Sequence, residues 1–258
     1  MTAPGGWCLG RYVDSISGNR RFWNQISGAY QHKHDARIGA TPRLWGTYAI
    51  PDAHLRALGD VTGKRVLELG CGAGQWSRAL AAEGAAVVGF DLSEEQLAAA
   101  ARTMGPVRYP LVQGAAEHLP FAADTFDLVF CDYGGLSWAP PHVAVPEAAR
   151  VLRRGGRLVF NVASPWFEAC YDEATSRATT TLQQDYFGLD TIDEDQGAVS
   201  YQLTYGDWIR VLRGAGLVID DLIEPRPDPE AANGYNKTDP PDWAHHWPAE
   251  ALWVTHKP

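Results

Sequence analysis

The sequence predicts an α/β protein built on a doubly wound, mostly parallel sheet. From about residue 61 onward, short apolar segments typical of buried strands alternate with amphipathic segments typical of helices. This alternation favours parallel strands joined by crossover helices that cover both faces of the sheet. Glycines also cluster directly after the first of these strands, at the edge of the sheet where ligands bind in this fold class.

Length and composition limit the kind of protein that the sequence encodes. With 258 residues, of which 45% are hydrophobic, the chain can bury a substantial core and suits one domain with additional segments. A net charge of −9 provides no basic face for nucleic acid or an anionic membrane, and no apolar run of about 20 residues is present. No CxxC pair occurs among the four cysteines. We therefore expect a cytoplasmic protein that binds neither nucleic acid nor membrane.

The N-terminal segment, residues 1–60, is predicted to be an arm followed by a helical cap. Its first 20 residues carry Gly, Ser and Pro without periodicity, so we expect them either to be loose or to lie over the surface. The stretch "RRFWNQISGAYQHKH" then places aromatic side chains at helical spacing. They share one face, which either packs into ordinary core or lines a pocket, and comprise Phe22, Trp23, Ile26, Tyr30 and His34.

Residues 61–164 are predicted to form the ligand-binding core. "RVLELG" is typical of a buried strand and "GQWSRALAAEG" of a helix ending at Gly84, and "AAVVGFDLS" and "SEEQLAAAARTMG" repeat this pattern. Ser93 and Gln96 form a capping box at the start of the second helix. The strands "VRYPLVQG" and "DTFDLVFCDYG", a helix near residues 142–153 and the strand "GGRLVFNVAS" follow.

Residues 165–205 interrupt the alternation and are predicted to form a lid. They mix aromatic residues with Thr, Gln and Asp, while residues 206–258 return to the C-terminal part of the core sheet. Tryptophans outside the core sheet favour an aromatic ligand pocket, although they can equally fill the interfaces between lid and core. These residues are Trp23, Trp45, Trp138, Trp166 and Trp243.

The stretch "VLELGCGAGQWS" carries the strongest functional signal. Gly70, Gly72 and Gly74 follow a strand and precede a helix, where a bare backbone lets a ligand approach the main chain. Neither the dinucleotide fingerprint G-x-G-x-x-G nor the triphosphate motif G-x-x-x-x-G-K-[ST] is present. Asp91 ends the next strand, where a carboxylate can accept hydrogen bonds from both hydroxyls of a ribose. The predicted ligand is a nucleoside without a phosphate requirement.

Five motifs follow one another over roughly residues 60–165, namely "ELGCGAGQWS", "GFDLS", "LVQGAAEHLPF", "DTFDLVFCD" and "ARVLRRGGRLVF". In this order they resemble the motifs of the class I S-adenosylmethionine-dependent methyltransferases. The resemblance implies a Rossmann-like, seven-stranded sheet whose last strand, near residues 249–256, is antiparallel, with "GLVIDDLIEP" beside it. It also implies S-adenosyl-L-methionine as the cofactor and S-adenosyl-L-homocysteine as the product.

The same resemblance implies the cofactor contacts. The methionine part lies over the glycines, Glu68 orders their loop, Asp91 holds the ribose and Leu92 touches the adenine. Ala115 stands where relatives often have an Asp that accepts from the adenine amino group, but the main-chain N–H of Ala116 can still donate. One lost hydrogen bond costs about 0.5–1.5 kcal/mol. The predicted cofactor-binding residues are Glu68, Gly70, Cys71, Gly72, Gly74, Asp91, Leu92, Ala115, Ala116, Glu117 and Cys131.

The predicted catalytic groups are His34, Tyr30 and Asp132. Tyr30 and His34 are four residues apart, so they can enter one pocket together, and a histidine titrates near neutral pH. Asp132 or Tyr133 is expected opposite them, at the end of a strand. His34 can equally be a packing residue, which leaves proximity and alignment as the source of rate. We expect no metal ion.

Three functional classes remain open at this point. The first is a methyltransferase of bacterial secondary metabolism acting on a small, aromatic acceptor at carbon, nitrogen or oxygen, with an indole carbon, a phenol oxygen or an amine all compatible. The second is a macromolecule-directed methyltransferase, for which the chain lacks a basic face. The third is a catalytically silent cofactor-binding protein, which the alanine at position 115 permits. Either a monomer or a homodimer is expected.

Overall fold

The computed structural model describes residues 9–38, 43–228 and 238–258. Within these ranges, the side chains of residues 9–14, 34–38 and 195 lie outside the description.

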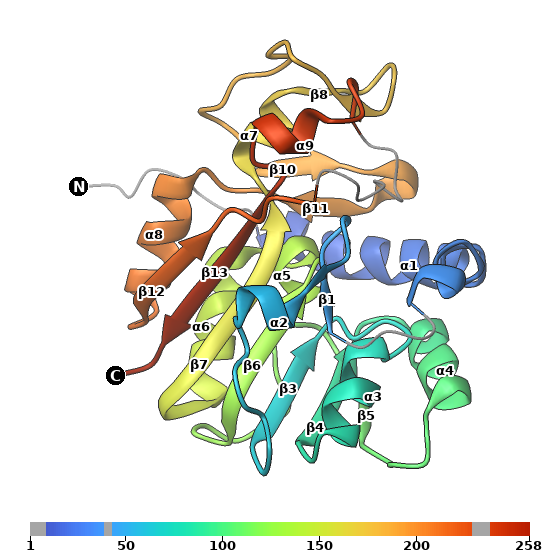
Figure 1. Ribbon diagram of the computed structural model, residues 1–258, viewed down its shortest axis with the longest axis vertical. Coiled ribbons are helices and arrows are strands. Elements are labelled where there is room, and N and C mark those ends of the chain that lie inside the picture. The colour runs from blue at the N-terminus through green and yellow to red at the C-terminus, as the bar shows by residue number, and fades with distance from the viewer. Residues whose placement is uncertain (1–8, 39–42, 229–237) are drawn as a thin grey trace.

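The core is a seven-stranded sheet (Figure 1). Its strands are β3 (Arg65–Leu69), β4 (Ala86–Asp91), β5 (Leu111–Gln113), β6 (Phe126–Asp132), β7 (Leu152–Ala163), β12 (Val218–Ile223) and β13 (Glu250–His256). They are arranged in the order β12-β13-β7-β6-β3-β4-β5. Strands β3 to β7 pair in parallel, whereas β13 runs antiparallel to both β7 and β12. The mostly parallel sheet and the antiparallel last strand confirm the fold class predicted from the sequence.

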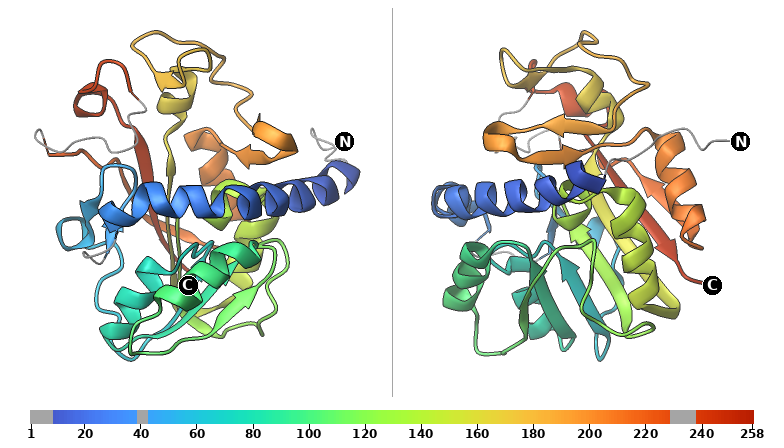
Figure 2. Two further views of the ribbon diagram at one scale, coloured as in Figure 1. Left: turned by 90° about the vertical axis from the view of Figure 1, so that its right-hand side faces the viewer. Right: turned by 180° about the vertical axis from the view of Figure 1, so that it is seen from behind.

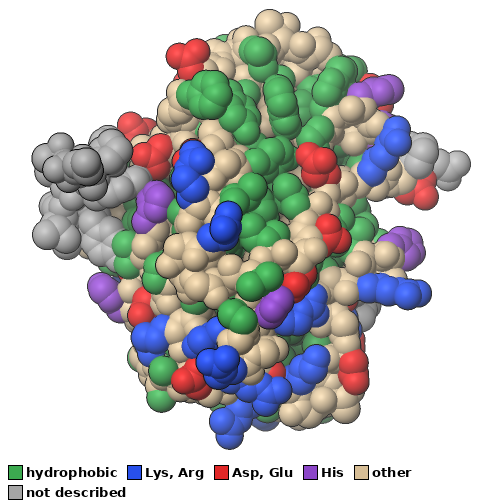
Figure 3. Space-filling view, turned by 90° about the vertical axis from the view of Figure 1, so that its left-hand side faces the viewer, with side chains coloured by type: hydrophobic (Ala, Val, Ile, Leu, Met, Phe, Trp, Pro, Cys, Tyr) green, Lys and Arg blue, Asp and Glu red, His purple; other side chains and the backbone are tan. Residues whose placement is uncertain are grey.

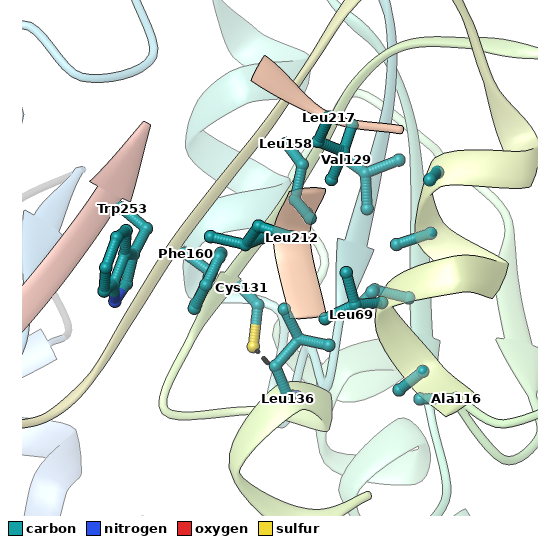
Figure 4. Packing of buried hydrophobic residues seen from close by; sticks show 14 of the residues in the cluster. Leu69, Ala116, Val129, Cys131, Leu136, Leu158, Phe160, Leu212, Leu217 and Trp253 are labelled. Atoms are coloured by element: carbon teal, nitrogen blue, oxygen red, sulfur yellow. Dashed lines mark hydrogen bonds between the residues drawn. The ribbon is translucent and has the colours of Figure 1, made fainter. Parts of the chain in front are cut away.

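Helices cover both faces of the sheet. Their bounds are α2 (Asp52–Leu55), α3 (Gln75–Ala82), α4 (Glu94–Thr103), α5 (Gly135–Trp138), α6 (Pro141–Val151) and α8 (Tyr205–Gly214). Along β6, Leu128 and Phe130 pack on the side of α3, and Val129 and Cys131 pack on the side of α6 and α8. Figure 4 shows the buried cluster on the side of α6 and α8, to which three strands contribute Leu69, Val129 and Phe160. The alternation of side chains along each strand thus produces two apolar layers.

Helix α1 (Leu9–Ile38) crosses the molecule between the sheet and the segments above it (Figure 2). The prediction that the first 20 residues are loose is therefore wrong for residues 9–20. Close packing holds this part of α1 in place, because a Cβ on Gly18 would overlap the Gly197 carbonyl. The Asn19 side chain donates to the carbonyls of Trp138 (2.7 Å) and Val199 (2.8 Å). These partners lie far along the chain, so no local sequence pattern indicates the helix.

The segment after β7 forms the upper part of the molecule. It contains α7 (Pro165–Ala169), the hairpins β8 (Tyr171–Asp172)/β9 (Arg177–Ala178) and β10 (Thr191–Asp193)/β11 (Val199–Tyr201), and the short helix η1 (Asp195–Gly197). Helix α9 (Trp243–His246) joins it from the C-terminal part. Trp243 and Ala244 pack with Cys170 and Ala178 in one buried cluster. Residues just before the last strand therefore help to build the segment predicted to be a lid.

On one face of the molecule, the surface of this upper part is more apolar than that of the core below it. Figure 3 shows hydrophobic side chains gathered in the upper half of one face and Lys and Arg side chains in the lower half. Phe187 is 88% exposed and Trp166 is 45% exposed. No helix in the described part of the chain combines the length and apolar character needed to cross a bilayer.

Candidate active site

A cavity of about 800 Å³ lies at the carboxyl ends of the parallel strands. The loops after β3, β4, β5 and β6 form its floor, and α1 and the segment from α7 to β11 form its walls. The hairpin of β1 (Leu44–Trp45) and β2 (Ile50–Pro51) closes another side. This position is the one expected for a ligand in an open parallel sheet.

The glycines of the first loop permit close approach of the main chain. Gly70 has φ +75°, and a Cβ there would overlap the main chain of Gly134 and Gly135. Gly72 has φ +51° and lines the cavity, where it has no backbone neighbour within 4 Å of an added Cβ. Gly74 is the N-cap of α3, and a Cβ there would crowd the Tyr109 hydroxyl. Gly70 and Gly72 therefore line the cavity, whereas Gly74 serves the packing of the loop behind it.

Two buried carboxylates hold this loop. Asp91 accepts hydrogen bonds from the main-chain N–H of Gly72 (2.8 Å) and of Ser93 (2.8 Å), and it lines the cavity. Glu68 accepts a hydrogen bond from the Ser77 hydroxyl, which fixes α3 against β3. Burial raises the pKa of Asp91 to about 6 and the pKa of Glu68 to about 8. Both side chains line the cavity beside the glycine loop, and their contacts with a ligand stay predictions.

Only some of the residues predicted at the adenine end of the cofactor site line the cavity. Leu92, Ala116 and Glu117 line the cavity, but Ala115 does not. Glu117 is 3% exposed, and among the described residues its carboxylate is hydrogen-bonded only to its own main-chain N–H. Burial raises the pKa of Glu117 to about 7. This carboxylate therefore has hydrogen-bonding capacity left for a ligand.

Cys131 lies in the core and not on the cavity wall. It is fully buried, and its sulfur accepts a hydrogen bond from the Leu136 N–H at 3.4 Å (Figure 4). Cys71, by contrast, lines the cavity. The structure thus places the two predicted cysteines in different environments.

A polar network occupies the ends of β6, β7 and β13. The Gly46 N–H donates to both oxygens of the Asp132 carboxylate at 3.1 and 3.0 Å. The Asn161 amide donates to Asp132 (3.0 Å) and to Glu250 (3.2 Å), so it bridges the two carboxylates. Glu250 also accepts from the N–H (2.6 Å) and the hydroxyl (2.7 Å) of Thr47. The network anchors the β1–β2 hairpin over the cavity.

Burial, and then the charge of Glu250, raise the pKa of Asp132 to about 7. Burial also raises the pKa of Glu250. Sequence reasoning missed Gly46, Asn161 and Glu250. The available signal was a polar residue within each of the apolar strands "RLVFNVAS" and "EALWVTH", where a buried polar group requires a partner.

Aromatic rings from α1 and α5 form one wall of the cavity. Trp23 lies edge-on to Trp138 (5.0 Å between ring centroids) and to Tyr30 (5.4 Å), and Phe22 stacks on Trp138 at 5.5 Å. All four residues line the cavity. The side chain of His34 lies outside the described residues. Of the other tryptophans considered above, Trp45 and Trp243 are buried in packing clusters, so tryptophan serves both as a pocket wall and as an interface filler.

The cavity wall is strongly acidic. Eight carboxylates line it, namely Glu68, Asp91, Glu117, Asp132, Glu168, Glu173, Asp193 and Glu194. Arg43 is the one Lys or Arg among the described lining residues, and it pairs with Asp52 and with Glu83 (2.7 Å). A cationic sulfonium compound suits such a wall electrostatically. The glycine loop, the Asp91 carboxylate predicted to bind a ribose, and the negative charge of the wall together fit S-adenosylmethionine.

Comparisons with known proteins show which family the chain belongs to. A family model described as a methyltransferase domain matches residues 67–160. The chain is 36% identical over 138 residues to a demethylmenaquinone methyltransferase of Clavibacter sepedonicus, covering 53% of this chain and 54% of that protein. It is 30% identical over 166 residues to the demethylmenaquinone methyltransferase of Corynebacterium kroppenstedtii, covering 63% of this chain and 69% of that protein. The chain thus spans between half and about two thirds of the length of these relatives.

The fold also matches solved structures. The crystal structure of an S-adenosylmethionine-dependent methyltransferase from Mesorhizobium loti superimposes with a TM-score of 0.65 at 25% identity, covering 79% of this chain and 95% of that chain. The chain belongs to the class I S-adenosylmethionine-dependent methyltransferases.

Proposed function

We propose that this protein transfers a methyl group from S-adenosylmethionine to a small aromatic acceptor, at carbon, nitrogen or oxygen. One observation carries the proposal: a single cavity extends from the glycine loop and Asp91 to the aromatic wall of α1 and α5. Its volume of about 800 Å³ lies toward the upper end of the range of about 300–1,000 Å³ found for ligand pockets. It therefore has room for a nucleoside cofactor with a second small molecule beside it.

The arrangement of the cavity supports an orientation for the cofactor. We infer that Asp91 accepts from the ribose hydroxyls, that Leu92 and Ala116 contact the adenine, and that Gly70 and Gly72 face the methionine part. Glu117 then accepts a hydrogen bond from the adenine amino group, in place of the carboxylate that is missing at position 115. A buried carboxylate without another side-chain partner gains most from such a bond, because a charged hydrogen bond contributes about 1.5–3 kcal/mol.

The wall of Phe22, Trp23, Tyr30 and Trp138 supports an aromatic acceptor, because ring pairs in offset or edge-on contact add about 0.5–1.5 kcal/mol beyond burial. The relatives named above are demethylmenaquinone methyltransferases, which also favours a ring system as the acceptor. We place this acceptor among the small molecules of secondary metabolism.

Tyr30 and Asp132 both line the cavity. Asp132 accepts hydrogen bonds from the Gly46 N–H and the Asn161 amide, so we infer that it positions the hairpin and the cavity floor. We keep His34 as a proposed base and Tyr30 as a proposed orienting group. Loss of a general base lowers turnover about 10²–10⁴-fold.

The test is a metabolite screen with methyl-labelled cofactor, followed by mass-spectrometric location of the new methyl group. Small aromatic compounds, RNA and protein extracts are offered in parallel. Label in a small aromatic product supports the proposal, and label in a macromolecule overturns it. Cofactor binding without any transfer would identify a silent binding protein instead. Unchanged turnover of His34→Ala across pH 6–9 would remove the proposed base.

A further inference from the structure

Three glutamine side chains form a hydrogen-bonded cluster on the cavity wall. Gln31 belongs to α1, Gln75 is the first residue of α3, and Gln96 lies in the first turn of α4. The Gln75 amide N–H donates to the Gln31 oxygen at 3.3 Å, and the Gln31 amide N–H donates to the Gln96 oxygen at 2.6 Å. All three residues line the cavity. This glutamine cluster therefore joins three helices at one place on the wall.

The glutamine cluster lies against the glycine loop. Gln75 follows Gly74 directly, and a Cβ built on Gly72 would lie 3.8 Å from the Gln96 oxygen. The Gly72 N–H also donates to Asp91 at 2.8 Å. The cluster is thus adjacent to the stretch of the loop that we infer to face the methionine part of the cofactor, next to the carboxylate inferred to hold the ribose.

Two polar groups of the cluster have no hydrogen-bond partner among the described residues. They are the Gln96 amide nitrogen and the Gln75 amide oxygen. Gln96 is 2% exposed, and its nitrogen is not among the enclosed unpaired atoms of the described side chains, so the small surface that it keeps opens into the cavity. A buried amide without a partner costs free energy, which a ligand acceptor at this nitrogen would recover.

The amino acid end of S-adenosylmethionine carries a carboxylate and an ammonium group. The ammonium group suits the acidic wall, but the carboxylate needs hydrogen-bond donors. Arg43 is the one Lys or Arg among the described lining residues, and it is already paired with Asp52 and Glu83. A glutamine amide supplies both a donor and an acceptor without a charge. The free nitrogen and the free oxygen of the glutamine cluster therefore match the two charged groups of this amino acid.

We propose that the glutamine cluster is the subsite for the amino acid end of the cofactor. The Gln96 nitrogen donates to the carboxylate of the bound cofactor, and the Gln75 oxygen accepts from its ammonium group. Gln31 links the two amides and thereby holds α1 against the cofactor. The inference rests on the cofactor orientation given under the proposed function, but it is independent of which acceptor is methylated.

The experiment compares three ligands by calorimetry. S-adenosylhomocysteine carries both charged groups, S-adenosyl-3-thiopropylamine lacks the carboxylate, and 5′-methylthioadenosine lacks the whole amino acid end. The variants are Gln96→Met and Gln75→Met, which replace the amide by an apolar group of similar length. The matched control is Gln183→Met, because the exposed Gln183 amide donates to the Thr179 hydroxyl at 3.2 Å and does not line the cavity.

Each variant should lose affinity for a different set of ligands. Gln96→Met should bind S-adenosylhomocysteine about 10- to 100-fold more weakly, because a charged hydrogen bond is lost, and should bind the two ligands without a carboxylate as before. Gln75→Met should weaken both ligands that carry the ammonium group by a similar factor and leave 5′-methylthioadenosine unchanged. Gln183→Met should bind all three ligands as the wild type does. Unchanged binding of 5′-methylthioadenosine also shows that a variant keeps a folded cofactor site.

Hydrogen exchange in α1 gives a second readout. With S-adenosylhomocysteine bound, the amides of residues 26–33 should exchange more slowly than with 5′-methylthioadenosine bound, because only the first ligand engages the cluster. Gln31→Met should abolish this difference.

The possible outcomes separate the subsite from the proposed function. Equal losses with all three ligands would place the amides at the adenosine part and overturn the subsite, as would wild-type affinities in both variants. A wild-type protein that binds none of the ligands overturns the cofactor orientation and the subsite together. If the expected pattern appears but no aromatic acceptor is methylated, the proposed function fails and the subsite stands.

Discussion

At the scale of single residues, four carboxylates that line the cavity differ in their hydrogen-bond partners. Asp91 is bonded to main-chain N–H groups, Glu68 to a hydroxyl, and Asp132 to a main-chain N–H and an amide. Glu117 is bonded only to its own main chain. Burying a carboxylate without hydrogen-bond donors costs free energy. Glu117 is therefore the carboxylate of these four that a donor on a ligand would stabilise most.

Glu117→Ala should therefore weaken binding of S-adenosylhomocysteine about 10- to 100-fold, the equivalent of one charged hydrogen bond. An analogue with oxygen in place of the adenine amino group should bind the wild type more weakly than S-adenosylhomocysteine, but should bind Glu117→Ala equally well. Because the pKa of Glu117 is raised to about 7, wild-type affinity should increase as pH rises through 7. Calorimetry with both ligands measures these effects, and equal discrimination by the two proteins would contradict the assignment.

Gly46 shows a different residue requirement. Its φ is +66°, and a Cβ there would overlap the Glu250 carboxylate. Gly46→Ala should lower the free energy of unfolding by about 1–3 kcal/mol through overpacking, with added backbone strain, and should lower methyl transfer. Gly63→Ala is the matched control, because Gly63 has φ +70° but open space around it. Denaturant unfolding measures both variants, and equal losses would show that backbone strain alone accounts for the effect.

At the scale of elements, α1 connects the sheet to the segment from α7 to β11. Arg20 pairs with Glu94 of α4 at 2.9 Å, and Asn19 bonds to both the N–H (2.7 Å) and the carbonyl (2.8 Å) of Val199 in β11. The same Asn19 amide reaches the last residue of α5, Trp138. One buried side chain thus joins three elements around the cavity, which supports treating α1 and the lid as one cover.

Asn19→Ala should loosen this cover. Removing the side chain leaves the buried Val199 N–H and carbonyl without their partner, at a cost of about 1–3 kcal/mol for an unsatisfied group. Amides of residues 191–201 should then exchange with deuterium faster, while those of β3 and β6 stay unchanged. His32→Ala, on an exposed part of the same helix, is the control. We also propose that residues 165–205 act as a lid. In the wild type they should then resist protease when cofactor and acceptor are both bound, since closure orders such segments. Unchanged exchange in Asn19→Ala would show that the contact does not hold the lid.

At the scale of the whole molecule, acidic groups surrounding one cavity make stability depend on pH. The folded pKa values of Asp91, Asp132 and Glu68 are raised to about 6, 7 and 8, above those of an unfolded chain. The folded protein therefore holds protons that the unfolded chain releases. The stabilisation is complete below about pH 4, near the unfolded pKa values, and is lost as pH rises through 6 to 8.

The melting temperature of the ligand-free protein should thus fall between pH 5.5 and pH 8.5. Glu68→Gln should reduce the upper part of this fall. S-adenosylmethionine stabilises the folded protein by about 2.7 kcal/mol at a hundredfold excess over Kd. Because the cofactor is a cation, a fixed concentration should raise the melting temperature more at pH 8.5 than at pH 5.5. Scanning calorimetry at the two pH values measures all three effects. A melting temperature that rises with pH in the ligand-free protein would contradict the roles assigned to these carboxylates.

The sequence by itself determined the sheet, the glycine loop and the place of Asp91. These features depend on contiguous residues: apolar strands, helix starts such as Ser93 with Gln96, and glycines whose positive φ values the loop requires. Their patterns are local, so they can be interpreted before any distant contact is known. The antiparallel final strand was predicted by family resemblance and is confirmed by its pairing with β7.

Only the tertiary structure decided the helical course of residues 9–20 and the composition of the polar network. Asn19 and Val199 are 180 positions apart, and Thr47 and Glu250 are 203 apart. A buried carboxylate or amide signals only that some partner is needed, because the partner is supplied by whichever segment folds beside it. The roles of Asn161 and Glu250 therefore become visible once β7, β13 and the β1–β2 hairpin meet at one edge of the sheet.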